Sequence, residues 1–216
     1  MAKAGTSSTV VERGSVRSAD TRRQLVRAAV ESLKTEGYAG ASARSIAERA
    51  GANQGLIFYH FGSVANLLLA ALDAVSAERM VRYRAAAEDA TSPMELVDVA
   101  TSIFREDLDA GYVTVLVEMI AGASSTPGLG PEVSARIGPW FDFAQRAIER
   151  SLDGTPLDSL LPSADAAYGV VALYLGLEML SHLTGDRERS LALFSHAAQL
   201  AGLLASMSGP SPREAP

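Results

Sequence analysis

The stretch AGANQGLIFYHFGS, residues 50–63, gathers the side chains of this sequence that are best suited to chemistry. Four ring-bearing residues follow one another from Phe58 to Phe61, although aromatic residues make up only 6% of the chain. An imidazole can serve as a general base or a metal ligand, and a phenol or imidazole rim can also donate hydrogen bonds to phosphate oxygens. The neighbouring sequence offers His60 no nucleophile or paired acid at a useful spacing, so we predict no catalytic residue and no enzyme activity.

The elements that must hold this stretch are three helices separated by glycines. The first begins at the capping-box pattern TRRQ, residues 21–24, and stops at Gly37. A second, short helix over residues 42–50 starts at a serine N-cap and is followed by Gly51, where a C-cap glycine belongs. A third runs over residues 53–60 with asparagine as its N-cap. Two short helices joined by a glycine-containing turn predict a helix-turn-helix.

In a helix-turn-helix the second helix of the pair enters the major groove with its N-terminal residues leading, and the preceding helix crosses the phosphates. A glutamine at the leading end can pair with adenine, and a glycine there lets the backbone approach DNA. Tyr59 and His60 lie one turn further on, within reach of phosphates; their alternative role is to cover the small domain. The predicted contacts are Arg44, Asn53, Gln54, Gly55, Tyr59 and His60.

Residues 21 to about 72 resemble the N-terminal domain of the TetR family of bacterial transcription regulators. The resemblance rests on the segments SIAERAG, ANQGLIFYHF and GSVANLLLAAL at their characteristic spacing. It implies an all-helical homodimer whose variable C-terminal domain binds a small effector and usually releases DNA in response. By position it supports Arg44, Gln54, Gly55, Tyr59 and His60 as DNA contacts and adds Phe58, whose alternative is a place in the core.

Composition and charge agree with a nucleic-acid contact on an otherwise acidic body. Residues 1–64 carry nine Lys or Arg against five Asp or Glu, whereas the remaining residues carry ten against twenty. The sequence has no cysteine, which favours a reducing compartment, and its first twenty residues lack the apolar region of a signal peptide. Polar residues interrupt the apolar runs, so we expect no membrane partner and a cytoplasmic location.

The pattern after residue 63 is helical almost throughout, which predicts an all-α fold of about nine helices. A three-helix helix-turn-helix domain at residues 20–66 is followed by a helical ligand-binding and dimerisation domain at residues 67–208. Residues 1–19 are expected to form a disordered arm and residues 209–216 a disordered tail. The segment YVTVLVEMI is rich in β-branched residues, yet no partner strand is apparent, so we assign it to a helix.

The last two helices, at residues 163–183 and 187–207, are apolar on more than one face, which predicts a homodimer held by a four-helix bundle. Ordinary burial within one chain is the alternative. An effector pocket is expected among the middle helices, without cofactor or metal, because Glu178, His182 and His196 lack a further convincing ligand. Its candidate lining is Phe104, Tyr112, Glu118, Met119, Trp140, Phe141, Tyr174, Glu178 and His182.

Together these features predict a ligand-responsive transcriptional regulator. We expect a repressor that a small hydrophobic effector releases from a palindromic operator in double-stranded DNA. The alternative is a helical small-molecule-binding protein or enzyme that has lost DNA binding.

Overall fold

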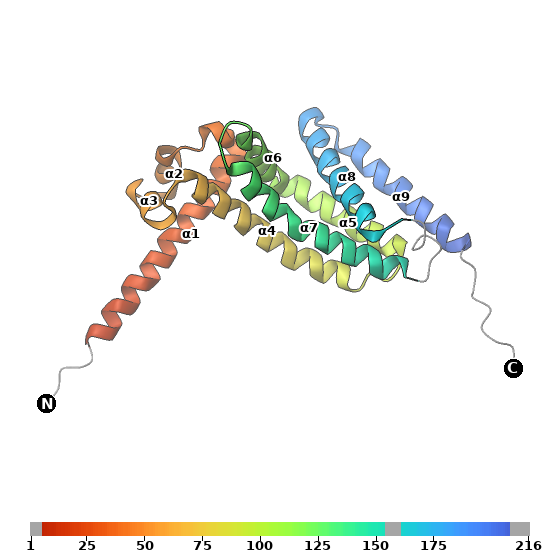
Figure 1. Cartoon of the computed structure of the whole chain (residues 1–216), viewed down its shortest axis with the longest axis horizontal. Helices are drawn as coiled ribbons and strands as arrows, with labels where there is room; N and C mark the ends of the chain where they lie inside the picture. The colour runs from red at the N-terminus through yellow and green to blue at the C-terminus, as the bar shows by residue number, and fades with distance from the viewer. Residues whose placement is uncertain (1–5, 154–160, 208–216) are drawn as a thin grey trace. The chain divides into compact units, whose positions relative to one another are not determined.

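The computed structural model of the 216-residue chain describes residues 6–153 and 161–207, with side chains described at residues 16–153 and 161–203. These residues form helices only, which confirms the predicted all-α class and the expected number of about nine helices (Figure 1). The helices are α1 (Thr6–Gly40), α2 (Ala43–Ala50), α3 (Gly55–Phe61), α4 (Val64–Glu88), α5 (Pro93–Ala110), α6 (Tyr112–Ala123), α7 (Leu129–Leu152), α8 (Ser163–Thr184) and α9 (Arg187–Met207).

Local capping explains most of the helix ends. At α2 the Ser42 hydroxyl accepts from the Ser45 backbone N–H while the Ser45 hydroxyl accepts from the Ser42 backbone N–H, each at 3.1 Å. Gly51 then ends the helix in the left-handed conformation, φ 61°, and its N–H donates to the carbonyls of the last turn. The predicted caps of the second helix are therefore confirmed. At α5, Ser92 and Glu95 form the same reciprocal pair, and hydrogen bonds from Thr91 and then from Ser92 lower the pKa of Glu95.

Helix α1 begins before the predicted capping box. Thr21 lies inside the helix, and its hydroxyl donates to the Arg17 carbonyl, 3.0 Å away, instead of accepting from the next turn. Residues 6–19, where a disordered arm is expected, are described as part of α1, and residues 1–5 lie outside the described range. Gly37 interrupts the helix as predicted, since its φ of 71° and ψ of 179° are open only to glycine.

Helix α3 starts two residues later than predicted. Asn53 still serves the entry turn, because its side-chain oxygen accepts from the Gly55 N–H at 2.7 Å. Ser63 caps the next helix, α4, by accepting from the Asn66 N–H at 3.1 Å. The β-branched segment of α6 is helical as expected, with Val113 and Val115 buried in the core. The predicted tail at residues 209–216 lies outside the described residues.

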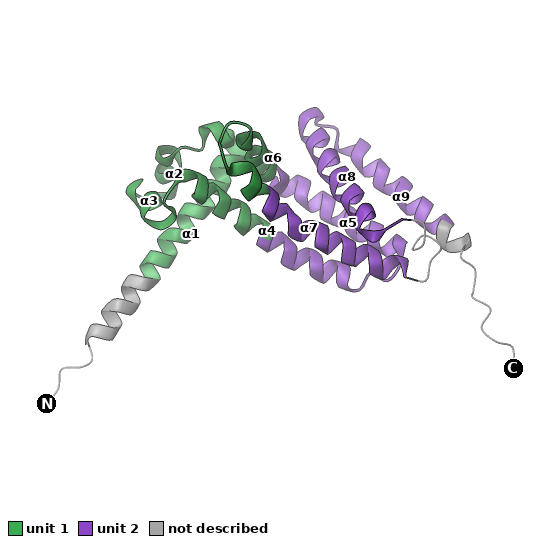
Figure 2. Ribbon diagram, in the orientation of Figure 1, with its two compact units in different colours: residues 1–76, 114–133 green, residues 77–113, 134–216 purple. Residues whose placement is uncertain are grey.

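The chain divides into two compact units (Figure 2). Unit 1 contains residues 1–76 and 114–133, and unit 2 contains residues 77–113 and 134–216. This division differs from a single boundary between residues 66 and 67, because part of α6 and the start of α7 belong with the N-terminal helices. Unit 1 is therefore built from two separate pieces of sequence.

Two glycines allow α6 to approach the end of α1 within unit 1. The Tyr38 N–H donates to the Glu118 carboxylate at 2.7 Å, and the Tyr38 hydroxyl shares a 2.9 Å hydrogen bond with Thr126. A Cβ at Gly37 would lie 2.7 Å from that same carboxylate, and one at Gly122 would overlap the Tyr38 ring. Close backbone approach thus fixes α6 against the helix that precedes the helix-turn-helix.

Candidate nucleic-acid interface and buried polar cluster

Helix α3 has one buried side and one solvent-facing side. Ile57 is fully buried and fixes the helix against the core of unit 1. Phe58 and Tyr59 on the other side are 51% and 78% exposed. The predicted leading residues, Asn53, Gln54 and Gly55, are also exposed, whereas His60 is half-buried. The residues predicted to touch DNA thus lie at or near the surface, and Phe58 is not a core residue.

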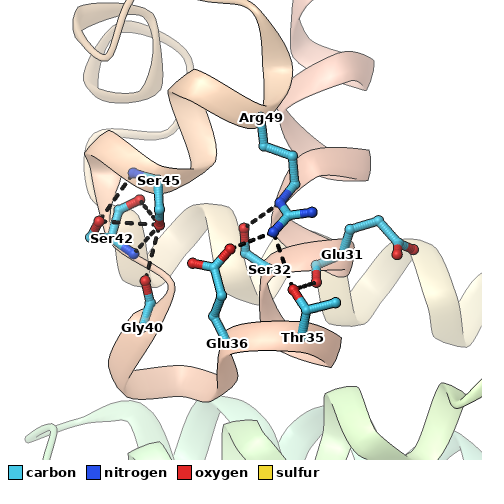
Figure 3. Close-up of polar contacts among 8 residues, drawn as sticks. All are labelled: Glu31, Ser32, Thr35, Glu36, Gly40, Ser42, Ser45 and Arg49. Atoms are coloured by element: carbon cyan, nitrogen blue, oxygen red, sulfur yellow. Dashed lines mark hydrogen bonds and ion pairs between the residues drawn. The ribbon is translucent and has the colours of Figure 1, made fainter.

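Arg49 joins α2 to α1 and so positions the helix before α3 (Figure 3). Its guanidinium donates to the hydroxyls of Ser32 and Thr35, each at 3.2 Å, and forms an ion pair with Glu36. Thr35 in turn donates to the Glu31 carbonyl at 2.7 Å. These contacts join α1 and α2 on the face where the two helices pack, and so they fix the angle between the helices.

Two further arginines flank α3 differently. Arg22 of α1 lies over the Phe61 ring, with its guanidinium carbon 4.9 Å from the ring centroid, and so covers the end of α3. Arg44 of α2 is highly exposed and forms a 2.9 Å ion pair with Glu48 one turn away. A phosphate can displace such a surface pair at low cost, because exposed ion pairs contribute only about 0–1 kcal/mol.

Unit 2 contains a buried ion pair between α4 and α5. Arg79 donates through Nε to Asp107 at 3.1 Å and through a terminal nitrogen to the other carboxylate oxygen. The hydroxyls of Tyr83 and Tyr174 also donate to Asp107, the latter at 2.5 Å. Burial alone would lower the pKa of Arg79, but the Asp107 carboxylate together with Tyr83 and Tyr174 outweighs burial and raises it. Both charges are thereby kept in a dry environment.

Aromatic rings enclose this pair. The Arg79 guanidinium carbon lies 4.9 Å from the Trp140 ring centroid and 5.8 Å from that of Tyr112. Phe104 meets Tyr174 edge to face, with ring centroids 5.4 Å apart. Five of the candidate effector residues thus gather in or beside the cluster: Phe104, Tyr112, Trp140, Tyr174 and Glu178.

The other four candidate effector residues make other contacts. Phe141 stacks on Tyr168, with ring centroids 5.5 Å apart, and His182 is exposed. Glu118 and Met119 belong to unit 1, where Glu118 accepts from Tyr38 and Met119 is fully buried. Their predicted effector contacts remain predictions.

Glu178 of α8 is the one unsatisfied acid that the described side chains show in this region. Its side chain is 4% exposed, and its Oε1 atom has no hydrogen-bond partner among the described residues. Burial raises the pKa of Glu178 to about 8, and the neighbouring Asp107 carboxylate adds to the shift. A buried polar atom without a partner costs free energy that a bound ligand can recover.

Sequence reasoning did not identify Arg79, Tyr83 and Asp107. Arg79 and Tyr83 stand four residues apart on α4, a spacing that solvated helix faces also show, and Asp107 is 28 residues further along the chain. No sequence signal joins these two places. Within the described part of the chain, no three His, Asp or Glu residues gather as a metal site.

Comparisons with known proteins agree with these features. A family model described as bacterial regulatory proteins, tetR family, matches residues 25–71, while a comparison with curated sequences found no match. A TetR-family transcriptional regulator from Cytophaga hutchinsonii has a TM-score of 0.73 at 19% identity, covering 90% of this chain and 98% of that chain.

Two solved neighbours carry small molecules. The regulator FadR from Bacillus subtilis, in complex with stearoyl-CoA, has a TM-score of 0.70 at 15% identity, covering 83% of this chain and 96% of that chain. The multidrug binding protein EbrR, complexed with imidazole, has a TM-score of 0.59 at 22% identity, covering 82% and 93%. At these identities the solved structures establish a shared fold. Residues 25–71 therefore match the family of bacterial regulatory proteins described as the tetR family, and most of the chain shares the fold of the solved regulators.

Proposed function

We propose that this protein is a cytoplasmic, DNA-binding homodimer that represses transcription and leaves a palindromic operator when a small hydrophobic effector binds. The observation that carries the proposal is the solvent-facing side of α3, where polar and aromatic side chains stand opposite the buried Ile57. In a helix-turn-helix that side enters the major groove. The acidic remainder of the chain leaves this region as the suitable surface for a polyanion.

The exposed residues divide into two kinds of contact. Gln54 reads base edges, since its amide can pair with N6 and N7 of adenine, and Gly55 allows the backbone to approach. Arg44, Tyr59 and His60 bind phosphate oxygens and set the register of the helix on the duplex. Asn53 holds the entry turn, and Phe58 contacts sugar or a thymine methyl group beside it.

Alanine at both Tyr59 and His60 is expected to lower duplex affinity by about 100-fold, since two hydrogen bonds to charged groups are lost at about 1.5 kcal/mol or more each. The duplex is first selected from a random DNA library with the wild-type protein, and affinity is then measured by fluorescence anisotropy at fixed salt. Tyr59 faces solvent, so the unfolding temperature should change little.

A charge-matched pair of variants provides the control. Arg44→Ala removes an exposed positive charge beside α3 and should weaken binding about tenfold, as expected for one charge-assisted hydrogen bond. Arg84→Ala removes an exposed positive charge of α4 in unit 2 and should leave affinity within about twofold. A double Tyr59 and His60 variant that folds and binds DNA as well as the wild type contradicts the proposal. Turnover of a small molecule without affinity for any duplex favours the alternative of a protein that has lost DNA binding.

Apolar side chains on α8 and α9 support the homodimer. Leu173 and Leu180 are both exposed and stand seven residues apart, as do Leu193 and Leu200 on α9. Seven-residue spacing places each pair on one side of its helix, as in helix bundles. By length and composition α8 could also cross a membrane, but only 22% of its apolar window is buried within one chain, and a second copy in a four-helix bundle would cover it.

Aspartate at both Leu173 and Leu200 is expected to convert the dimer to a monomer at micromolar concentration, because charges would be buried in an apolar interface. Sedimentation velocity measures the change, and circular dichroism should show unchanged helix content. Val81→Asp is the control, because Val81 of α4 is 72% exposed and lies outside the proposed interface. A wild-type monomer at these concentrations, or an equal effect of Val81→Asp, contradicts the dimer.

The effector is proposed to bind at the aromatic cluster of unit 2. Phe104, Trp140 and Tyr174 offer an apolar enclosure with few polar groups, which is the usual composition of a small-molecule site. The neighbours in complex with stearoyl-CoA and imidazole support a small-molecule role for this fold. Binding lowers DNA affinity to the extent that the effector prefers the conformation that does not fit the operator.

A further inference from the structure

The buried polar cluster of unit 2 contains one more acid than base. The hydrogen-bonding capacity of Asp107 is filled, because its carboxylate accepts from Nε and one terminal nitrogen of Arg79 and from the hydroxyls of Tyr83 and Tyr174. Arg79 directs its charge at that carboxylate and lies at the same time against the Trp140 ring. The two charges therefore cancel, and Glu178 remains without a counter-ion in the described structure.

The other charged groups that act on Glu178 do not supply one. Arg187 of α9 lowers the pKa of Glu178 only weakly, and its guanidinium is held by Asp109 at 2.7 Å and by the Leu108 carbonyl at 3.1 Å. On α8 itself, the Tyr174 hydroxyl donates to Asp107 at 2.5 Å and also hydrogen bonds to the Glu178 carboxyl, which lowers the pKa of Glu178 but supplies no charge, while His182 lies one turn after Glu178 and is exposed. The remaining charged groups that act on Glu178 are Arg79 on α4 and Asp107 on α5.

We propose that Glu178 is the anchor for a positively charged group, so that this site takes a small molecule with a protonated amine on an apolar body. The proposal rests on the proposed function and deepens it by giving the chemical class of the effector. The ammonium group donates to Glu178 Oε1, the atom without a partner, and balances the negative charge that Glu178 acquires when it ionises. The ring of Tyr174, which lies one turn before this acid on α8 and meets Phe104 edge to face, suits a cation as well as an alkyl chain.

Charge also distinguishes a cationic ligand from an anionic ligand and from a neutral one. A carboxylate ligand would bring a negative charge close to Asp107 with no base left to balance it, which a buried site disfavours strongly. A neutral alcohol would pair with Glu178 in its protonated form and gain no ionic interaction. Binding of an ammonium group instead ionises Glu178 and releases its proton to solvent near pH 7, because the free acid is largely protonated there.

The test uses the full chain and three probes with the same alkyl body: octylamine, octanol and octanoate, below their aggregation concentrations. Calorimetry at pH 7 is expected to show octylamine binding about tenfold or more tightly than octanol, with octanoate weakest. Repeating the titration in buffers of different ionisation enthalpy should reveal proton release for octylamine alone. A Glu178 with a merely structural role would produce no such release.

Two variants of equal charge change complete the test. Glu178→Gln keeps the shape and hydrogen-bonding capacity of the side chain, and it should abolish both the preference for octylamine and the proton release. Glu188→Gln, at an exposed position of α9, should leave both unchanged, and thermal unfolding checks that each variant folds.

Octylamine that binds no better than octanol, an equal loss in Glu188→Gln, or absence of binding by all three probes overturns the proposal. DNA affinity of the ligand-free protein is measured separately. A protein that binds its duplex but does not prefer octylamine refutes only this inference, whereas a protein without duplex affinity refutes the proposed function.

Discussion

Replacing Asp107 with alanine is expected to lower the free energy of unfolding by about 3–5 kcal/mol. The reason is that Arg79 is buried and would keep its charge without a partner, since the Trp140 ring cannot replace a carboxylate. The hydroxyls of Tyr83 and Tyr174 would lose their acceptor as well. Urea denaturation followed by circular dichroism measures the loss.

Asp109→Ala is a closely matched control for this prediction. Asp109 lies on the same helix, two residues after Asp107, and forms a 2.7 Å ion pair with Arg187. Both partners are exposed, so its loss should cost about 0–1 kcal/mol. Equal losses for the two variants contradict a buried pair. Replacing Arg79 with methionine and Asp107 with leucine together should cost less than Asp107→Ala, because no charge is then left buried.

The wild-type protein is expected to lose stability relative to Glu178→Gln as the pH rises from about 4.5 to about 8. Burial raises the pKa of Glu178 from its ordinary value of 4.5 to about 8, so in this range the folded chain keeps a proton that the unfolded chain has lost. Folding then binds a proton, and a rise in pH opposes it. At about 1.4 kcal/mol per pKa unit the difference amounts to a few kcal/mol.

Urea denaturation of both proteins at several pH values measures this difference, in which the other titrating groups largely cancel. Below pH 4.5 the difference should be constant, because Glu178 is protonated in both states, and above pH 8 it should level off again. Glu188→Gln provides the comparison, because it makes the same charge change at an exposed position. A flat difference between pH 5 and pH 9 contradicts the prediction.

Helix ends were predictable from sequence wherever a short-range hydrogen bond determines them. Ser42 and Gly51 bound α2 as expected because their caps involve residues within one turn. Thr21 was interpreted wrongly, since a hydroxyl can accept from the following turn or donate to the preceding one, and the sequence pattern is the same in both cases. The start of α3 shifted for a related reason, because the side chain of Asn53 stabilises a turn before the helix.

The surface residues near α3 were predictable because they belong to one continuous stretch with a buried face at helical spacing. The cluster around Asp107 was not, because it joins α4, α5, α7 and α8 through contacts between residues far apart in the chain. Five of its aromatic and acidic members were named from residue type alone. Residue type does not reveal that Arg79 neutralises Asp107 and leaves Glu178 without a counter-ion in the described structure.

The two-piece make-up of unit 1 has a consequence for building chimaeric regulators. Exchanging DNA specificity between related regulators by a single crossover assumes that the DNA-binding unit is one contiguous segment of sequence. Here residues 114–133 accompany residues 1–76, and Glu118 and Thr126 bind Tyr38 directly. A transplant that keeps these contacts needs both segments from the same parent, so a single splice after α4 would join halves that did not evolve to fit.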